Sequence, residues 1–257
     1  MAGSAGAVLV VGGAAGYYAL TNEGGAPATQ KVTTAVTQSS LKSSTPTTQV
    51  PLSGNSGQDL PENIGLRMQY QETSEWCWIA VATSINHFYN PASTVTQCEL
   101  RTAVGHMIGG FPGNACPAAT AIANVPGLAA KLADPYAKTA LYALDNPGLV
   151  LPYRDNHPGN VADALKVNGN LNLTEPSIAL TRIVSEISAG RPIAVDIKWN
   201  QGGQHCVAIA GVLNDMLLIC DPIRGESVIH YESFPSAYQS GASLMAVCLT
   251  KKGPDEA

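Results

Sequence analysis

The sequence is short of positive charge. It carries 14 Lys and Arg against 19 Asp and Glu, which gives a formal net charge of −5. No basic stripe is present that could neutralise a phosphate backbone, so we predict no nucleic-acid partner. The rest of the composition, with 45% hydrophobic and 13% charged residues, is ordinary for a soluble globular protein.

Cysteine is also scarce. Six cysteines in 257 residues are too few for a disulfide-dense scaffold. None of them forms a C-x-x-C pair, and they are too scattered for a zinc module. We therefore predict neither a metal ion nor a cofactor.

The N-terminal segment, residues 1–21, lacks charged side chains altogether. Its apolar run over 7–20 is glycine-rich and too short for a confident membrane span, which needs about 20 residues. A secretory signal would have this apolar length, with Ala26-Pro27-Ala28 as a cleavage motif, but the basic start of a signal is missing. The segment is consistent with a signal or membrane anchor and equally with plain glycine-rich low complexity. We expect a secreted or cell-envelope location, while a cytoplasmic location stays open.

Residues 22–60 have almost nothing to bury. They are rich in Ser, Thr, Gln, Gly and Pro, a composition typical of a disordered linker or a pro-segment. The folded domain is predicted to span 61–252, followed by a tail at 253–257. We expect it to be a monomer.

Within the domain, helical patterns come first and strand patterns later. Residues 77–89 are apolar on nearly every face, which indicates a central buried helix that ends before Asn90-Pro91. A second helix is predicted around 180–187. Residues 193–199 alternate as a half-buried strand, and two further strand runs meet at a tight turn near 213–215. This order predicts an α+β domain.

Cys77 is the candidate nucleophile. A catalytic cysteine needs a lowered pKa, an imidazole partner and donors for the oxyanion of the tetrahedral intermediate. Cys77 opens the buried helix and so would face the positive end of its dipole. Gln71, a short loop upstream, could donate to the oxyanion; His205 is the candidate base, and Asp221 in the next strand could orient it.

The hairpin allows a geometric test. With its turn centred on Leu213, His205 faces Asp221 and both side chains emerge on one face of the sheet. The same register sets Cys206 opposite Cys220 on the other face. That pair could form a disulfide or remain two buried thiols in contact. Cys98 and Cys116, on either side of a glycine-rich loop, could also be bridged.

These residues resemble the papain-like cysteine peptidases over about residues 65–250. The resemblance lies in Gln71 six positions before Cys77-Trp78, a distal Gly-Gly-Gln-His, and an Asp-Pro strand end. The "WCW", "SEISAGRPIAVDIKW" and "DPIRG" stretches are closer to the bacterial effector and secreted branch than to the lysosomal one. The sequence departs from the lysosomal pattern at 74–76, where Ser-Glu-Trp stands for Cys-Gly-Ser, and in using Asp221 rather than asparagine.

The resemblance implies a papain-like fold, with a helical half around a buried central helix and an antiparallel sheet half. It implies an endopeptidase of proteins or peptides with Cys77 as nucleophile, His205 as base, Asp221 as orienter and Gln71 in the oxyanion hole. A cysteine beside tryptophan is more often core than catalytic, but the four residues together favour catalysis. Two alternatives remain: another acyl-transfer enzyme (deamidase, transamidase or cell-wall peptide amidase), or a binding module on a peptidase fold.

Overall fold

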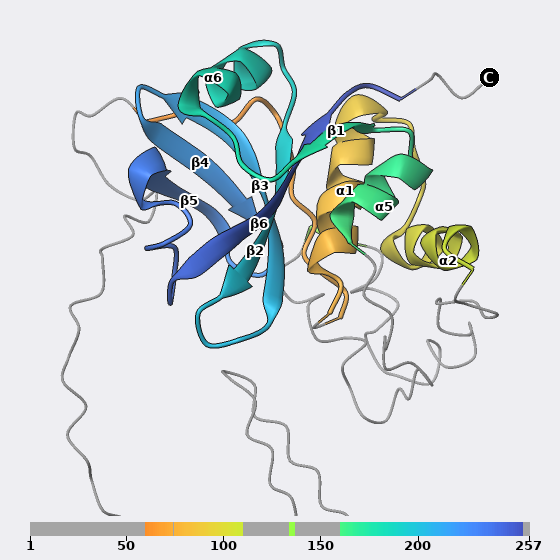
Figure 1. The fold of residues 1–257 in the computed structure, drawn as a ribbon. Coiled ribbons are helices and arrows are strands. Elements are labelled where there is room, and N and C mark those ends of the chain that lie inside the picture. Colours follow the sequence, from red (N-terminus) through yellow and green to blue (C-terminus); the bar gives the residue numbers. More distant parts are fainter. Residues whose placement is uncertain (1–59, 74, 110–133, 137–159, 254–257) are drawn as a thin grey trace, which may run out of the picture. The chain divides into compact units, whose positions relative to one another are not determined.

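The structure is a computed structural model, and it describes residues 60–73, 75–109, 134–136 and 160–253 (Figure 1). All of these residues belong to one compact unit. Residues 1–21, nearly all of 22–60, and Cys116 lie outside the described residues. The expectations for the signal or anchor, the linker and the domain boundaries therefore stay predictions.

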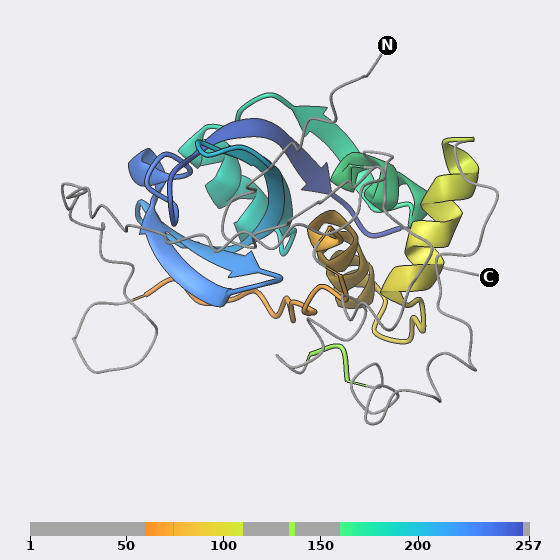
Figure 2. The same ribbon diagram turned by 90° about the horizontal axis from the view of Figure 1, so that it is seen from below.

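Among the described residues, three helices build one half of the domain. Helix α1, Cys77–Tyr89, is buried from Cys77 to Asn86 and ends at Tyr89, directly before Asn90-Pro91. It packs against α2, Gln97–Met107, and α5, Val161–Val167. Figure 2 views α1 nearly end-on, with the sheet on one side and α5 and α2 on the other.

The other half is a six-stranded antiparallel sheet in the order β1-β6-β2-β3-β4-β5. Helix α6, Leu180–Ser188, packs on β3 and β2. The strands are β1 Leu171–Glu175, β2 Ile193–Trp199, β3 Gln204–Leu213, β4 Met216–Asp221, β5 Gly225–His230 and β6 Ala242–Thr250. Helices together with an antiparallel sheet confirm the predicted α+β class.

The sheet has two buried faces with separate hydrophobic cores, as alternation along a strand requires. Along β2 and β3, the buried apolar side chains at even-numbered positions up to Ala210 belong to the core that includes α1, and those at odd-numbered positions up to Ile209 belong to the core that includes α6. Within the described residues, no helix is long and apolar enough to cross a bilayer.

The hairpin of β3 and β4 turns at Asn214 and Asp215, where Leu213 pairs with Met216. Asn214 has φ 56, a left-handed conformation that asparagine tolerates better than most side chains. A β-bulge interrupts the ladder between Ile209 and Gly211, and beyond it Ala208 pairs with Cys220. The sequence predicted the turn but not the bulge.

The bulge is also where the segment that carries Gln71 joins the sheet. The backbone N–H of Ile64 donates to the carbonyl of Ala210 at 2.9 Å. Next to it, a Cβ on Gly211 would collide with the carbonyl of Glu62, so only glycine allows the two backbones to approach this closely. From here the segment crosses from the sheet to the helical half.

Candidate active site

Cys77 is the first residue of α1, and its exposed fraction is 9%. No side chain caps this end of α1. The first backbone N–H groups of a helix have no partner within it and carry the positive end of its dipole. A negative charge on the Cys77 sulfur would therefore be stabilised there.

His205 and Asp221 form a buried pair. The ring Nε2 of His205 lies 2.9 Å from Oδ2 of Asp221, and the exposed fractions are 4% and 0%. Nε2 is thereby occupied, and the ring also hydrogen-bonds with Cys77. This leaves Nδ1 as the nitrogen for the thiol. The structure thus brings together three of the four predicted site residues.

The pKa of His205 reflects this pairing. Burial on its own would lower the pKa of the imidazole, because it disfavours the charged form. The hydrogen bonds to Asp221 and Cys77, with the attraction of their negative charges, outweigh burial and raise the pKa to about 10. The environment therefore favours the imidazolium form of His205 beside the Asp221 carboxylate.

Asp221 is held as a carboxylate. Burial alone would raise its pKa, but the hydrogen bonds it accepts, led by the one from His205, lower the pKa below its ordinary value. Its Oδ1 accepts from the backbone N–H groups of Ile223 at 2.7 Å and Arg224 at 3.1 Å. Both oxygens are thus engaged, which fixes the orientation of the carboxylate plane.

The predicted register of the hairpin was wrong, although the His205–Asp221 contact is present. Because Ala208 pairs with Cys220, the ladder sets Asp221 opposite Val207 and diagonal to His205. Diagonal neighbours share a face and remain within reach of a long side chain. Cys206 and Cys220 are likewise diagonal rather than opposed.

The cysteines settle one alternative that the sequence left open. Cys206 and Cys220 are free, as are Cys77 and Cys248, so the hairpin carries no disulfide. Cys98 is disulfide-bonded. Its predicted partner, Cys116, lies outside the described residues.

Gln71 lies in a loop six residues before Cys77 and is completely buried. Its backbone N–H donates to the carbonyl of Pro222 at 3.0 Å, which ties the loop to the residue after Asp221. The side-chain Nε2 donates to the carbonyl of Thr73 at 2.6 Å. An amide nitrogen carries two hydrogens, so one remains for an oxyanion.

Sequence reasoning missed two aromatic residues of the site. Trp199, interpreted from its alternation as a core strand residue, stacks on the ring of His205 at 5.5 Å between centroids. The ring of Tyr238 stacks with that of Trp199 at 6.1 Å between centroids, and the Tyr238 hydroxyl donates to Oδ2 of Asp221 at 2.8 Å. The glycines before His205 could have pointed to Trp199, because they let the chain fold back on it; no local signal marks Tyr238.

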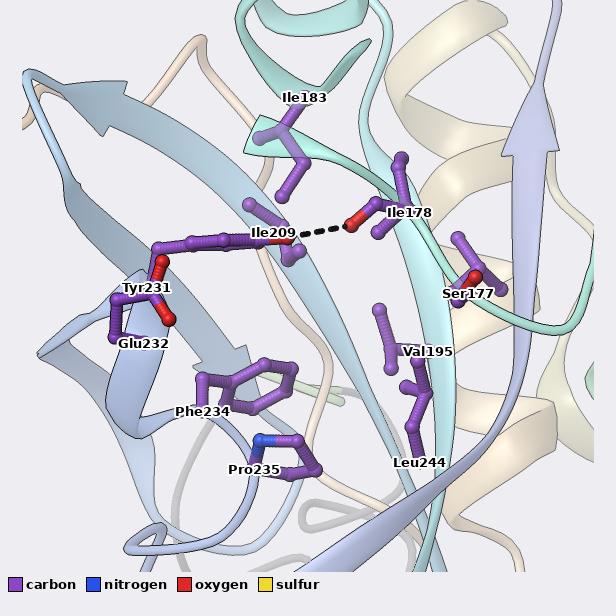
Figure 3. Close-up of a pocket in the computed structure, with 11 residues that line it drawn as sticks. Ser177, Ile178, Ile183, Val195, Ile209, Tyr231, Glu232, Phe234, Pro235 and Leu244 are labelled. Atoms are coloured by element: carbon purple, nitrogen blue, oxygen red, sulfur yellow. Dashed lines mark hydrogen bonds between the residues drawn. The ribbon is translucent and has the colours of Figure 1, made fainter. Parts of the chain in front are cut away.

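A cavity of about 210 Å³ lies on the α6 face of the sheet (Figure 3). The Tyr231 hydroxyl reaches across it and donates to the carbonyl of Ile178 at 3.0 Å. Aliphatic side chains such as Ile183 and Val195 form its walls, and none of the four candidate site residues lines it. Among the described residues, no cluster of His, Cys, Asp and Glu could hold a metal ion.

Comparisons with known proteins agree with this geometry. The model of the peptidase C39-like family matches residues 63–242. The chain belongs to this family. The match supports the cysteine-peptidase part of the resemblance and lends no support to the effector branch. No curated protein matches the chain.

Among solved structures, the chain is similar to a candidate C39-like peptidase from Bacillus anthracis. The likeness covers 76% of this chain and 100% of that one, at 16% sequence identity and a TM-score of 0.43. At that score it adds nothing to the family match.

Proposed function

We propose that the protein is a cysteine endopeptidase that hydrolyses peptide bonds through an acyl-thioenzyme. One observation carries the proposal: the buried His205 ring, oriented by Asp221 at 2.9 Å, also hydrogen-bonds with Cys77 at the start of α1. A nucleophile, its base and the group that orients the base are the minimum set for this chemistry. Membership of the C39-like family supports the same conclusion.

In the proposed mechanism the Cys77 thiolate attacks the carbonyl carbon of the scissile peptide bond. The negative charge that develops on the carbonyl oxygen is stabilised by the Cys77 backbone N–H and the Gln71 amide. The His205 imidazolium then gives its proton to the leaving amine, and the acyl group stays on the sulfur. Water, deprotonated by the now neutral His205, attacks the acyl carbon and releases the carboxylic acid, which restores the Cys77 thiolate and the His205 imidazolium.

Alkylation with iodoacetamide at pH 6, followed by peptide mapping, tests the nucleophile. Cys77 should be modified, because it stands at the uncapped start of α1 and hydrogen-bonds with the His205 ring, the surroundings of a reactive cysteine. Three other thiols serve as internal controls. Burial raises the pKa of Cys248 to about 11, and it also raises the pKa values of Cys206 and Cys220. Alkylation that does not favour Cys77 would contradict the proposal.

A peptide-library digest tests the reaction. A peptidase produces new termini, whereas a deamidase converts glutamine to glutamate without cleaving the chain, and mass spectrometry separates the two. Cleaved peptides from the wild-type protein, and intact ones from Cys77→Ala, are the expected result. Alkylation of Cys77 without any cleavage would favour another acyl transfer, and a protein with neither reaction would be a binding module.

A further inference from the structure

Gln97, the first residue of α2, is a buried polar side chain with an exposed fraction of 0%. The hydrogen bonds described for its side chain all go to the segment that carries Gln71. Its Oε1 accepts from the backbone N–H of Glu72 at 3.0 Å, and its Nε2 donates to the carbonyl of Tyr70 at 2.8 Å. The second hydrogen of Nε2 goes to Oε1 of Gln69 at 3.2 Å. Both amide hydrogens are therefore used.

The two backbone groups that Gln97 contacts stand on either side of Gln71. The backbone of Gln71 itself donates to Pro222, on the sheet side. Gln71 is thus held from the helical half through Gln97 and from the sheet through Pro222. Neither flank can move without leaving a buried polar group unpaired, which is energetically unfavourable.

Gln97 is in turn fixed by the start of its helix. The side chain of Thr96 accepts from the backbone N–H of Glu99, and the side chain of Glu99 accepts from the backbone N–H of Thr96. This reciprocal cap stops the first turn from fraying or rotating. Gln97 is therefore a rigid support for the 69–72 segment.

We propose that Gln97 is a positioning residue for the oxyanion site. By holding the backbone on both sides of Gln71, it sets where the Gln71 amide meets the developing negative charge. The proposal rests on the proposed function, in which Gln71 is an oxyanion donor. Gln97 touches neither substrate nor reacting atoms, so it acts only through Gln71.

Two probes of Cys77 separate this role from a general structural one. p-Nitrophenyl acetate acylates the thiolate through a tetrahedral oxyanion, whereas iodoacetamide alkylates it without forming one. In Gln97→Leu, which keeps the volume and removes the hydrogen bonds, acylation should slow about 10- to 100-fold because the donor is misplaced. Alkylation should change by less than about threefold.

A double variant provides the second readout. In a Gln71→Ala background, Gln97→Leu should slow acylation no further, because the residue through which it acts is gone. Gln97→Asn, one methylene shorter, keeps a polar group at the site if Gln97→Leu fails to fold. Gln97→Asn should also slow acylation without slowing alkylation, because the shorter side chain cannot reach the backbone groups on both sides of Gln71.

Asn170→Leu is the matched control. Asn170 is another buried amide, 1% exposed, whose Nδ2 donates to the carbonyl of Lys251 at 3.1 Å. Its loss should lower stability without changing the ratio of the acylation and alkylation rate constants. Equal slowing of both reactions in Gln97→Leu, or slowing that multiplies with Gln71→Ala, would overturn the positioning role. Failure of the proposed function is distinct, since wild-type Cys77 would then react with iodoacetamide no faster than a free thiol.

Discussion

The two faces of the sheet bury side chains of different sizes. The core shared with α1 takes small residues from the strands: Ala194, Cys206, Ala208, Ala210, Cys220 and Cys248. The core shared with α6 takes large ones: Ile193, Val195, Ile197, Val207, Ile209, Leu217 and Ile219. Small side chains let a helix approach the strands closely, whereas large ones fill a wider space.

This difference matters for the site. Cys77 comes from the helix on the small-residue face, and His205 and Asp221 alternate onto the large-residue face at the end of their strands. The thiol and the ring thus come from opposite faces of the sheet, and they meet in the hydrogen bond between Cys77 and the His205 ring. A substitution that enlarges a side chain on the face toward α1 should therefore destabilise the fold. A substitution that shortens a side chain on the face toward α6 should do the same.

The largest expected effect is on turnover, and it separates two buried cysteines of the small-residue core, Cys77 and Cys248. Cys77→Ala should lower the hydrolysis of a cleaved library peptide by about 1,000-fold or more, because the covalent step is lost. Cys248→Ala, in the same core, should leave turnover within about threefold, because this thiol packs in the core and contacts the Thr174 hydroxyl rather than His205. Retention of about a tenth of wild-type turnover by Cys77→Ala would remove it from the nucleophile role.

Two adjacent residues of β3 test the packing difference directly. Ile209→Ala should lower the free energy of unfolding by about 2–5 kcal/mol, because it leaves a cavity. Ala208→Ile should lower it by about 1–3 kcal/mol, because the added methylenes meet α1. Urea denaturation measures both. If Ala208→Ile leaves the free energy of unfolding unchanged, the small-residue face has unfilled volume next to α1.

The ionised pair on the large-residue face should make stability depend on pH. The pKa of His205 is raised from 6.5 to about 10. Its stabilising contribution is thus complete below pH 6.5 and lost as pH rises towards 10. The pKa of Asp221 is lowered from 3.8, so its contribution is present above that pH and lost as pH falls through the lowered value.

Denaturation of the wild type and His205→Gln across pH checks this expectation. The difference in the free energy of unfolding should shrink between pH 6.5 and about 10. A difference that grows over this range would mean that the ring is neutral in the folded protein, with burial dominant.

The smallest effect concerns the hydroxyl of Tyr238, which donates to Asp221 at 2.8 Å. Tyr238→Phe keeps the ring that stacks on Trp199 and removes one of the hydrogen bonds that orient the carboxylate. Turnover should fall about 3- to 10-fold, the effect of one hydrogen bond. Tyr231→Phe, which loses a hydroxyl across the cavity instead, is the control and should not change turnover.

The elements around the site were predictable where a regular pattern ends at a clear stop. The helix at 77–89 was placed correctly because its apolar run ends at Asn90-Pro91. The strand at 193–199 was placed correctly because large apolar residues alternate with smaller or polar ones along it. Helices α2 and α5 and strands β1, β5 and β6 were not predicted. The buried residues of α2 include the polar Gln97 and Arg101, and β1 is mostly exposed, so neither has a strong hydrophobic period.

What the sequence determined by itself was the inventory of the site: a cysteine at a helix start, a histidine and an aspartate on adjoining strands, and a glutamine upstream. Their mutual geometry depended on tertiary structure. Continued without interruption from Leu213 and Met216, the ladder would set Asp221 opposite Ala208 and on the other face from His205. The extra residue at the bulge between Ile209 and Gly211 reverses that alternation and returns the two to one face. The bulge has no local sequence signal, because it forms where the 62–64 segment, which is far away in the sequence, contacts Ala210 and Gly211.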